Sequence, residues 1–422
     1  MNMGRTGLCG NVKGSALVIA VLLALLVAFL MTVGGQLIAT SNTESHTQQK
    51  VLTEADNVAR AGLVDAIAWF KRQSQQPVRS GYPPTYYTYA DGAFYPRVST
   101  DTTKNATIDE SIGLVKEYQL SEDSKKWARY EVRRQPDTAS NAYDSHSVHD
   151  ISGLRIYGKN NGEGLVWYIE SAGYVYMKND TSKAYNEAPN KVVAHVRSST
   201  EIRRLALSLP LEAAVLTKSG GSSYSRTVTL NKNGRIMAGH YTGVGYVSGS
   251  SPKVNSGGSI TGSTQYKSGI DDPTVSYVLG VSTSELKMLA DYVVTDTSLL
   301  PSDMPDMALI FINGDASFTS SRPLSGGGIL FVNGNLNIAA DSNAVYSGLI
   351  YATGTVTISD PALISGTVIA YGGLTLSRSA ATDIAEIDYD PTILSSVRQQ
   401  ICQYRENKSA LHVFIGVPGL EN

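Results

Sequence analysis

Two histidines with flanking aspartates form the most metal-like cluster of the chain: Asp144, His146, His149 and Asp150. Imidazole and carboxylate groups are common metal ligands, and two histidines three positions apart can share one face of a helix. The serines and asparagines around the cluster are typical of a loop, however, and no third ligand is indicated. We therefore expect no metal at this cluster.

Motifs for catalysis are missing from the sequence. It contains no G-x-S-x-G elbow, no phosphate-binding loop and no H-E-x-x-H pair. Asp303 and Asp306 lie beside prolines, where an aspartate that forms a turn is more common than a calcium ligand. We expect no enzymatic activity and no cofactor.

Four segments near the C-terminus repeat one pattern around Gly314, Gly334, Gly354 and Gly372, at spacings of 20, 20 and 18 residues. The positions two and four residues before and after each glycine are all apolar. They are Ile310, Ile312, Ala316, Phe318, Leu330, Val332, Leu336, Ile338, Ile350, Ala352, Val356, Ile358, Val368, Ala370, Leu374 and Leu376. A step of two is the side-chain period of a strand, and stacked repeats can bury such a face. The pattern predicts a parallel β-solenoid with each glycine at a corner, where a positive φ costs a glycine little. An antiparallel sheet is the alternative, but its neighbouring strands would run through this phase in reverse.

The coils have a second candidate corner, and their aspartates can be tested for a catalytic arrangement. Ser-Gly pairs precede three of the strands, beginning at Ser325, Ser347 and Ser365. Polysaccharide-cleaving β-helices need paired carboxylates from neighbouring coils. Asp315, Asp341 and Asp360 lie one, seven and six residues after their reference glycines, so they are out of phase. A stacked acidic site is not expected.

An unbroken apolar run from Ala16 to Met31 lies near the N-terminus, within uncharged sequence from Gly14 to Thr43. About 20 residues suffice to cross the hydrocarbon core, and a cleaved secretory signal would have a shorter apolar core. Arg5 and Lys13 precede the run, which favours a cytoplasmic N-terminus. The run predicts a retained transmembrane helix.

The helical pattern continues beyond this run. Apolar residues fall three or four positions apart, which is typical of one stripe on a helix, and Gln75 to Pro77 marks its end. The stripe comprises Val51, Ala55, Val58, Ala59, Leu63, Ala66, Ile67 and Phe70. We expect one long rod, although an anchor followed by a separate helix gives the same pattern.

The segment Lys13–Gly35 resembles the N-terminus of type IV prepilins, which have a short basic leader ending in glycine before a long apolar helix. On this resemblance, Gly14 precedes the cleavage site of a prepilin peptidase and Ser15 is the first mature residue. The segment Ala55–Phe70 resembles the corresponding stretch of PilX-like pilus assembly proteins. The resemblance implies as partners other minor and major pilins, the peptidase, an inner-membrane assembly platform and membrane lipid before assembly.

The chain departs from the prepilin pattern at Ile19. Most pilins have a glutamate at this fifth mature position, where it is thought to pair with the terminal amine of a neighbouring subunit. An unpartnered carboxylate in lipid is costly, and the pseudopilin that caps secretion pseudopili also lacks it. The departure, together with the bulk of a solenoid, favours a minor, tip-located subunit over the main filament subunit.

The region between helix and repeats contains strand-like runs at 114–134, 164–177 and 191–207, which predict an antiparallel sheet against the rod. The expected fold class is α+β: a long transmembrane and amphipathic helix on a pilin-like sheet, followed by a parallel β-solenoid. The expected divisions are a leader (1–14), a transmembrane helix (15–40), an amphipathic helix (41–76), a pilin-like domain (77–210), an irregular β-rich region with a short helix (211–300), the solenoid (301–385), and a cap helix with tail (386–422). Within them we expect a long loop over 248–266, a helix over 281–292 with Thr283 or Ser284 near its N-cap, a helix over 391–405 that covers a solenoid end, and a tail, 411–417, that pairs with a solenoid edge.

Three functions fit these observations. The first is a minor pilin of a type IV pilus or a type II secretion-like filament, acting in assembly and adhesion. The second is an enzyme or a carbohydrate-binding β-helix held in the membrane, which the out-of-phase acids disfavour, and the third is a polymer-forming solenoid scaffold. The near-neutral charge of −2 predicts no nucleic-acid partner. The first function places the protein in the inner membrane with its C-terminal part in the periplasm, and at the cell surface after assembly.

Overall fold

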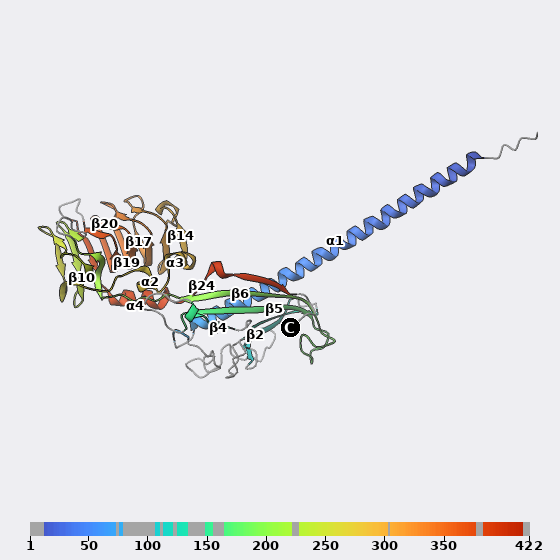
Figure 1. Cartoon of the computed structure of the whole chain (residues 1–422), viewed down its shortest axis with the longest axis horizontal. Coiled ribbons are helices and arrows are strands. Elements are labelled where there is room, and N and C mark those ends of the chain that lie inside the picture. The colour runs from blue at the N-terminus through green and yellow to red at the C-terminus, as the bar shows by residue number, and fades with distance from the viewer. Residues whose placement is uncertain are drawn as a thin grey trace, which may run out of the picture.

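The computed structural model describes residues 12–72, 76–78, 106–109, 113–120, 125–133, 148–154, 164–221, 228–302, 304–376 and 383–416. One long helix, α1 (Val12–Arg72), leads into an antiparallel sheet, and a parallel β-solenoid follows (Figure 1). The N-terminal half of α1 projects away from both (Figure 1).

The antiparallel sheet packs against the C-terminal half of α1. Its strand order is β1-β2-β3-β5-β6-β24, and β4 and β25 pair with β5 and β6. These strands are β1 (Ala106–Asp109), β2 (Gly113–Gln119), β3 (Lys126–Arg133), β4 (His149–Asp150), β5 (Val166–Met177), β6 (Lys191–Arg204), β24 (Tyr404–Glu406) and β25 (His412–Gly416). Most of the predicted apolar stripe of α1 is buried here, from Ala55 to Phe70, together with Trp69. The strands expected at 114–134, 164–177 and 191–207 are therefore confirmed.

The repeats form coils of a parallel β-solenoid. Their strands are β15 (Ala308–Ile312), β16 (Ala316–Phe318), β17 (Ser325–Val332), β18 (Leu336–Ile338), β19 (Ala344–Ala352), β20 (Thr355–Ile358), β21 (Ala362–Ala370) and β22 (Gly373–Leu376). Neighbouring coils pair in parallel, with Ile310 opposite Leu330, and Ile350 opposite Leu330 and Val368. All sixteen apolar positions of the repeat lie in one buried cluster. The parallel solenoid is confirmed, and the antiparallel alternative is wrong.

One outer face of the solenoid is covered by three helices, α2 (Val275–Leu279), α3 (Thr283–Leu289) and α4 (Pro391–Gln400). Strands on this face bury both sides, as the five buried residues of β15 show. Phe311, Phe331 and Tyr351 stack beneath the helices, with ring centroids 4.9 and 5.2 Å apart. The outward-facing positions of the strands beneath the helices are therefore as apolar as the inward-facing ones.

The coils are not stacked in chain order. Strands β7 (Ala213–Ser219), β8 (Val228–Leu230) and β9 (Gly234–Met237) pair with β21, β22 and β23 (Ala385–Asp388) at the end of the last repeat. From there β10 (Thr242–Ser248), β11 (Lys253–Val254), β12 (Ser259–Thr261) and β13 (Thr264–Ser268) extend the stack to one end. The chain then crosses through α2 and α3 to β14 (Tyr292–Val294) at the other end. The coil of β7, β8 and β9, which comes first in the chain, therefore lies in the middle of the stack, next to the coil of β21 and β22, the last of the repeats.

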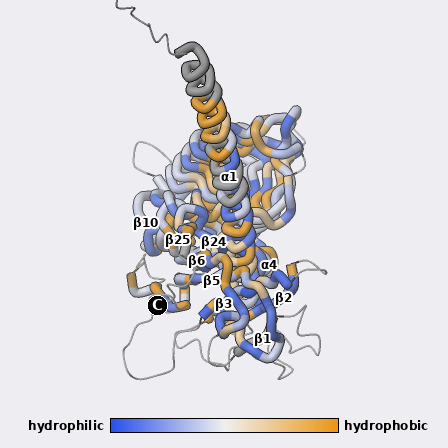
Figure 2. Tube along the Cα trace, turned by 90° about the vertical axis from the view of Figure 1, so that its right-hand side faces the viewer, coloured by the Kyte–Doolittle hydropathy of each residue, from blue (hydrophilic) through white to orange (hydrophobic). Residues whose placement is uncertain are grey.

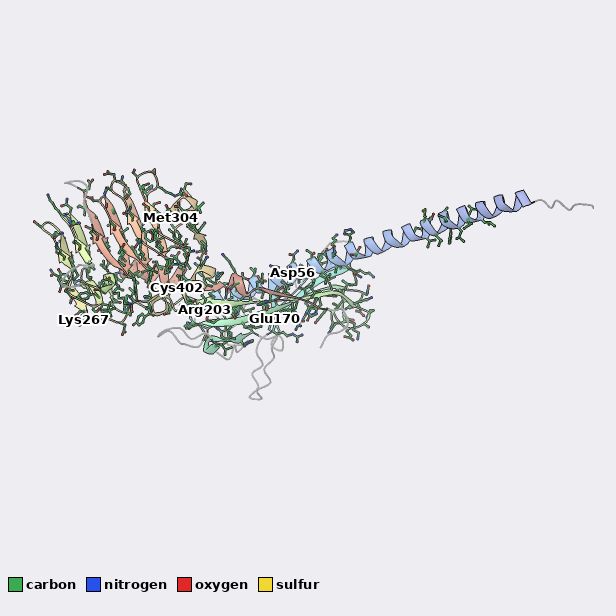
Figure 3. The ribbon with its side chains drawn as sticks, turned by 45° about the horizontal axis from the view of Figure 1, so that its top comes forward. Asp56, Glu170, Arg203, Lys267, Met304 and Cys402 are labelled. Atoms are coloured by element: carbon green, nitrogen blue, oxygen red, sulfur yellow. The ribbon has the colours of Figure 1, made fainter. Side chains whose placement is uncertain are left out.

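The junction between sheet and solenoid is made by the continuation of β6 and by the C-terminal segment. Arg203, of which 5% of the side chain is exposed, forms an ion pair with Glu285 of α3. The backbone amide of Ala206 donates to the Leu279 carbonyl at 3.1 Å, and Arg405 Nη1 lies 2.6 Å from Asp291 Oδ1. Arg203 and Cys402 mark this junction in Figure 3.

The fold class expected from the sequence is wrong. Strands contain more of the described residues than helices do, so the protein is mainly β rather than α+β. Among the described residues, no helix is both long and apolar enough to span a membrane. The domain boundaries remain a prediction.

Four local expectations also need correction. Residues 248–266, expected as a loop, contain β11, β12 and part of β13. Their Gly- and Ser-rich sequence gives no local strand signal, and they form strands because they pair with strands of neighbouring coils. The N-cap of α3 is Ser282, which forms a capping box with Glu285. Helix α4 packs beside β19 and β21 instead of covering a solenoid end. The tail pairs with β6 of the antiparallel sheet instead of a solenoid edge.

Candidate functional site

The projecting part of α1 contains apolar residues (orange in Figure 2), and their side chains are exposed. They are Leu22, Leu23, Leu25, Leu26, Val27, Phe29, Leu30 and Met31, with between 45% and 73% of each residue exposed. A contiguous apolar surface of this kind in a soluble environment marks a site of association. We call residues 22–31 the apolar arm.

The other half of α1 is held to the sheet by polar contacts as well as by its apolar stripe. Asp56 accepts a hydrogen bond from Ser198 Oγ on β6 at 3.2 Å and pairs with Arg60 Nε at 2.9 Å. Glu54 pairs with Lys126 of β3, and Asp65 accepts a hydrogen bond from the Tyr130 hydroxyl. The helix therefore presents the apolar arm from a fixed base.

The residues predicted for processing lie at the start of α1. Gly14, Ser15 and Ile19 are all within the helix, and their side chains lie outside the described ones. Nothing in the structure tests cleavage between Gly14 and Ser15, so it stays a prediction.

The corner glycines Gly314, Gly334, Gly354 and Gly372 stack on one another. The Gly354 amide donates to the Gly334 carbonyl at 2.8 Å, and the Gly372 amide donates to the Gly354 carbonyl at 2.9 Å. Only Gly314 of the four has the expected positive φ, at 144°. At the other three the close approach excludes a side chain, because a Cβ would lie within 2.9 Å of backbone atoms of the preceding coil.

The Ser-Gly corner is shifted in one coil. Gly328 pairs with Gly348, and Gly348 with Gly366, so Ser325 and its following glycine lie out of register with the other two pairs. Gly328, Gly348 and Gly366 all have positive φ, between 118° and 148°.

The described members of the histidine and aspartate cluster, His149 and Asp150, each have partners of their own. His149 is buried and its ring packs 4.9 Å from that of Tyr168, while Asp150 accepts hydrogen bonds from Ser152. Asp144, His146 and Asp303 lie outside the described residues. Within the residues that are described, no group of three or more histidine, cysteine, aspartate or glutamate side chains could hold a metal ion.

Two of the three acids of the coils lie beside each other, because the Asp341 amide donates to the Asp360 backbone carbonyl at 3.1 Å. Asp315 Oδ1 accepts a hydrogen bond from the Asn335 amide at 2.7 Å, Asp341 lies in a turn with φ 58°, and Asp360 is buried.

A charged network covers the outer face of the antiparallel sheet. The buried Glu131 carboxylate lies 2.7 Å from Arg129 Nε and 3.3 Å from Arg133 Nη2. Burial opposes ionisation of Glu117, but the hydrogen bond from Lys178 Nζ at 2.6 Å and the nearby charge of Arg129 help to outweigh it, and the Glu117 pKa is lowered. The network borders a cavity of about 360 Å³. Its acids and bases satisfy one another, so it is best explained as structural.

A second cavity, of about 520 Å³, lies on the helix-covered face of the solenoid, beside α2 and α3. Seven of its eight lining side chains carry a hydroxyl group, and none is charged. Sequence reasoning missed this cavity because its residues come from four separate segments. A density of Thr and Ser around 274–284 was the only sign of it.

Comparisons with known proteins identify no family. No family model matches the chain, and no curated protein matches it. Among solved structures, the competence-associated pilin ComZ from Thermus thermophilus matches at a TM-score of 0.20 with 11% identity, covering 87% of this chain and 98% of that one. A similarity this low carries no argument about fold or function.

Proposed function

We propose that the protein is a minor pilin, located at the tip of a type IV pilus or a type II secretion-like filament, with a structural and adhesive role and no enzymatic one. The apolar arm is the observation that supports this most directly. A helix that leaves eight large apolar side chains exposed gains stability once other helices cover them, and each covered side chain contributes about 1.5–3 kcal/mol. A bundle of pilin helices would supply such a cover.

The arrangement of the domains supports the same role. The arm extends to one side of the antiparallel sheet and the solenoid lies on the other (Figure 1). A chain assembled through its arm would therefore present the solenoid away from the filament core. In this proposal the partners are other minor and major pilins, the prepilin peptidase and the assembly platform. The protein would be at the inner membrane, with its C-terminal part in the periplasm, before assembly and at the cell surface afterwards.

Self-polymerising scaffolds are less well supported. The strand β13 at one solenoid end pairs only with β10 among the described strands, so an edge is open. Lys253 on β11 and Lys267 on β13 are exposed, and Figure 3 shows Lys267 at the solenoid end that lies far from α1. Charged side chains on an edge oppose pairing with a further strand, so stacking of identical ends is not favoured.

The decisive experiment is to sequence the N-terminus of the mature protein in filaments sheared from the cell surface. The proposal expects Ser15 at the N-terminus and other pilins in the same preparation. An intact Met1, or absence of the chain from filaments, would contradict it.

The role of the apolar arm has its own test. Phe29→Lys places an unpaired charge where neighbouring helices should pack, so we expect at least tenfold less of the variant in filaments, measured by immunoblot. Val64→Lys is the control, because Val64 is also exposed on α1 (63% against 67% for Phe29) but lies beside the sheet. Equal incorporation of the two variants would contradict assembly through the arm.

A further inference from the structure

The 520 Å³ cavity beside α2 and α3 has walls suited to an uncharged polar ligand. Tyr351 and Thr353 belong to the coil of β19, Tyr371 to the coil of β21, and Thr283 to α3. Ligand sites commonly have volumes of about 300–1,000 Å³, so the cavity has room for a sugar unit.

The hydroxyl groups of the cavity differ in whether the protein already uses them. Tyr351 donates to the Pro273 carbonyl at 2.9 Å, and Ser282 is engaged with Glu285 in the capping box. The side-chain hydroxyls of Thr283 and Thr353 make no hydrogen bond to any residue that the structure describes. Two walls of the cavity thus offer groups that can both donate and accept hydrogen bonds.

Tyr371 joins the cavity to a balanced pair of charges. Its hydroxyl lies 3.0 Å from Lys218 Nζ and 3.2 Å from Asp272 Oδ2, and these two charged groups are 3.9 Å apart. Asp272 Oδ1 is shielded from solvent and has no hydrogen-bond partner within the described part of the chain. Since the two charges offset each other, nothing here favours a strongly charged ligand.

We infer that this cavity binds a neutral sugar unit of a glycan. Each sugar hydroxyl donates and accepts hydrogen bonds, as the threonine hydroxyls do, and an aromatic ring such as that of Tyr371 provides a flat apolar wall with a polar tip. The inference gives a ligand class to the adhesive part of the proposed function and rests on that function only for its biological setting.

Binding is tested on the full chain in a zwitterionic detergent, since a detergent with a sugar headgroup would compete for the site. The probes are the methyl glycosides of glucose, galactose, mannose and N-acetylglucosamine, titrated by calorimetry and by saturation-transfer NMR. Glucuronic acid and N-acetylneuraminic acid are the charged comparators. We expect saturable binding of at least one neutral sugar and weaker binding of the acids.

Variants locate the binding. Thr353→Val should weaken it about threefold to tenfold, as expected for one lost hydrogen bond, and Tyr371→Ala more than tenfold. Tyr371→Phe keeps the ring but removes the hydroxyl, so we expect an intermediate loss of affinity. This variant keeps the test informative if Tyr371→Ala fails to fold. Thr357→Val, in β20 and outside the cavity, should leave the affinity unchanged.

Three results would overturn the inference: no neutral sugar binds, only the acidic sugars bind, or binding is the same in Thr353→Val and Tyr371→Phe as in the parent. None of these results depends on filament assembly. A protein that binds sugar but is absent from filaments would instead contradict the proposed function alone.

Discussion

At Gly348 the backbone of one solenoid coil passes too close to the next for any side chain to fit. The residue has φ 148°, and a Cβ added to it would lie 2.0 Å from the Gly328 carbonyl oxygen. The stacked glycines at this corner let the backbones of successive coils approach one another, and an inflexible carbonyl is the atom that a methyl group would meet. Each coil therefore depends on its neighbour for this close contact.

We expect Gly348→Ala to destabilise the protein by roughly 2–5 kcal/mol, from backbone strain and overpacking together. The midpoint of urea unfolding, followed by circular dichroism, measures the effect. Gly153→Ala is the matched control, because a Cβ there meets nothing within 4 Å. Equal midpoints for the two variants would show that the corner tolerates a side chain.

A second prediction at this scale concerns His195 on β6. Burial lowers the pKa of His195 from 6.5 to about 4, with Arg197 and Arg133 adding to the shift and Glu131 opposing it. In the unfolded chain the imidazole binds a proton below about pH 6.5, whereas in the folded protein it stays neutral until about pH 4. The free energy of unfolding should therefore fall as the pH drops through this window.

His195→Gln removes this group and should flatten that part of the profile of stability against pH, measured by urea unfolding at intervals between pH 4 and 7. His240→Gln is the control, because His240 is exposed. An unchanged slope in His195→Gln would mean that other groups cause the loss of stability in acid.

At the scale of elements, α1 lies on β5 at a point where only glycine fits. A Cβ at Gly173 would lie 2.4 Å from the Ala55 carbonyl oxygen and 2.5 Å from the Ala59 nitrogen. Two small residues of the helix and one glycine of the strand thus allow a close approach of helix and sheet. This contact places the base from which the apolar arm projects.

Gly173→Ala should push α1 away from β5 and cost roughly 3 kcal/mol, because both atoms that it meets belong to the helix backbone. The fully buried Trp69 reports the change through its fluorescence. A spectrum and an unfolding midpoint equal to those of Gly153→Ala would contradict the close packing of α1.

The sequence predicted secondary structure well wherever a single side-chain period runs through a segment. The sixteen apolar positions define strands, an inward face and a register, because neighbouring coils repeat the same phase. The placement of β7–β9 after the last repeat was not predictable in this way, since no local signal says which coil lies beside an irregular one. The 520 Å³ cavity beside α2 and α3 was not predictable for the same reason, because its walls come together only after these helices pack on the solenoid. For the membrane span expected at the N-terminus, the described part of the chain contains no helix that is both long and apolar enough.

At the scale of the whole molecule, the solenoid is inserted into the antiparallel sheet. The chain leaves the sheet after β6 and returns as β24 and β25, which pair with β6 again. Tyr404 of β24 is fully buried, and its hydroxyl accepts a hydrogen bond from the Val78 amide at 2.9 Å. If the solenoid unfolded, this pairing would have to close a flexible loop of about 200 residues, at an entropic cost on the order of 5 kcal/mol.

The return strands should therefore lose protection together with the solenoid. Ile350→Ala removes a fully buried side chain from the inner stack and should destabilise the solenoid by about 2–5 kcal/mol. In hydrogen exchange monitored by mass spectrometry, we expect faster exchange in the coils and in residues 404–416, and unchanged protection in β5, which α1 and β3 cover. Leu363→Ala is the control, since Leu363 faces outward and is 40% exposed. If 404–416 stayed protected while the coils of Ile350→Ala exchanged freely, the sheet would hold its return strands without the solenoid, and the two parts would fold independently.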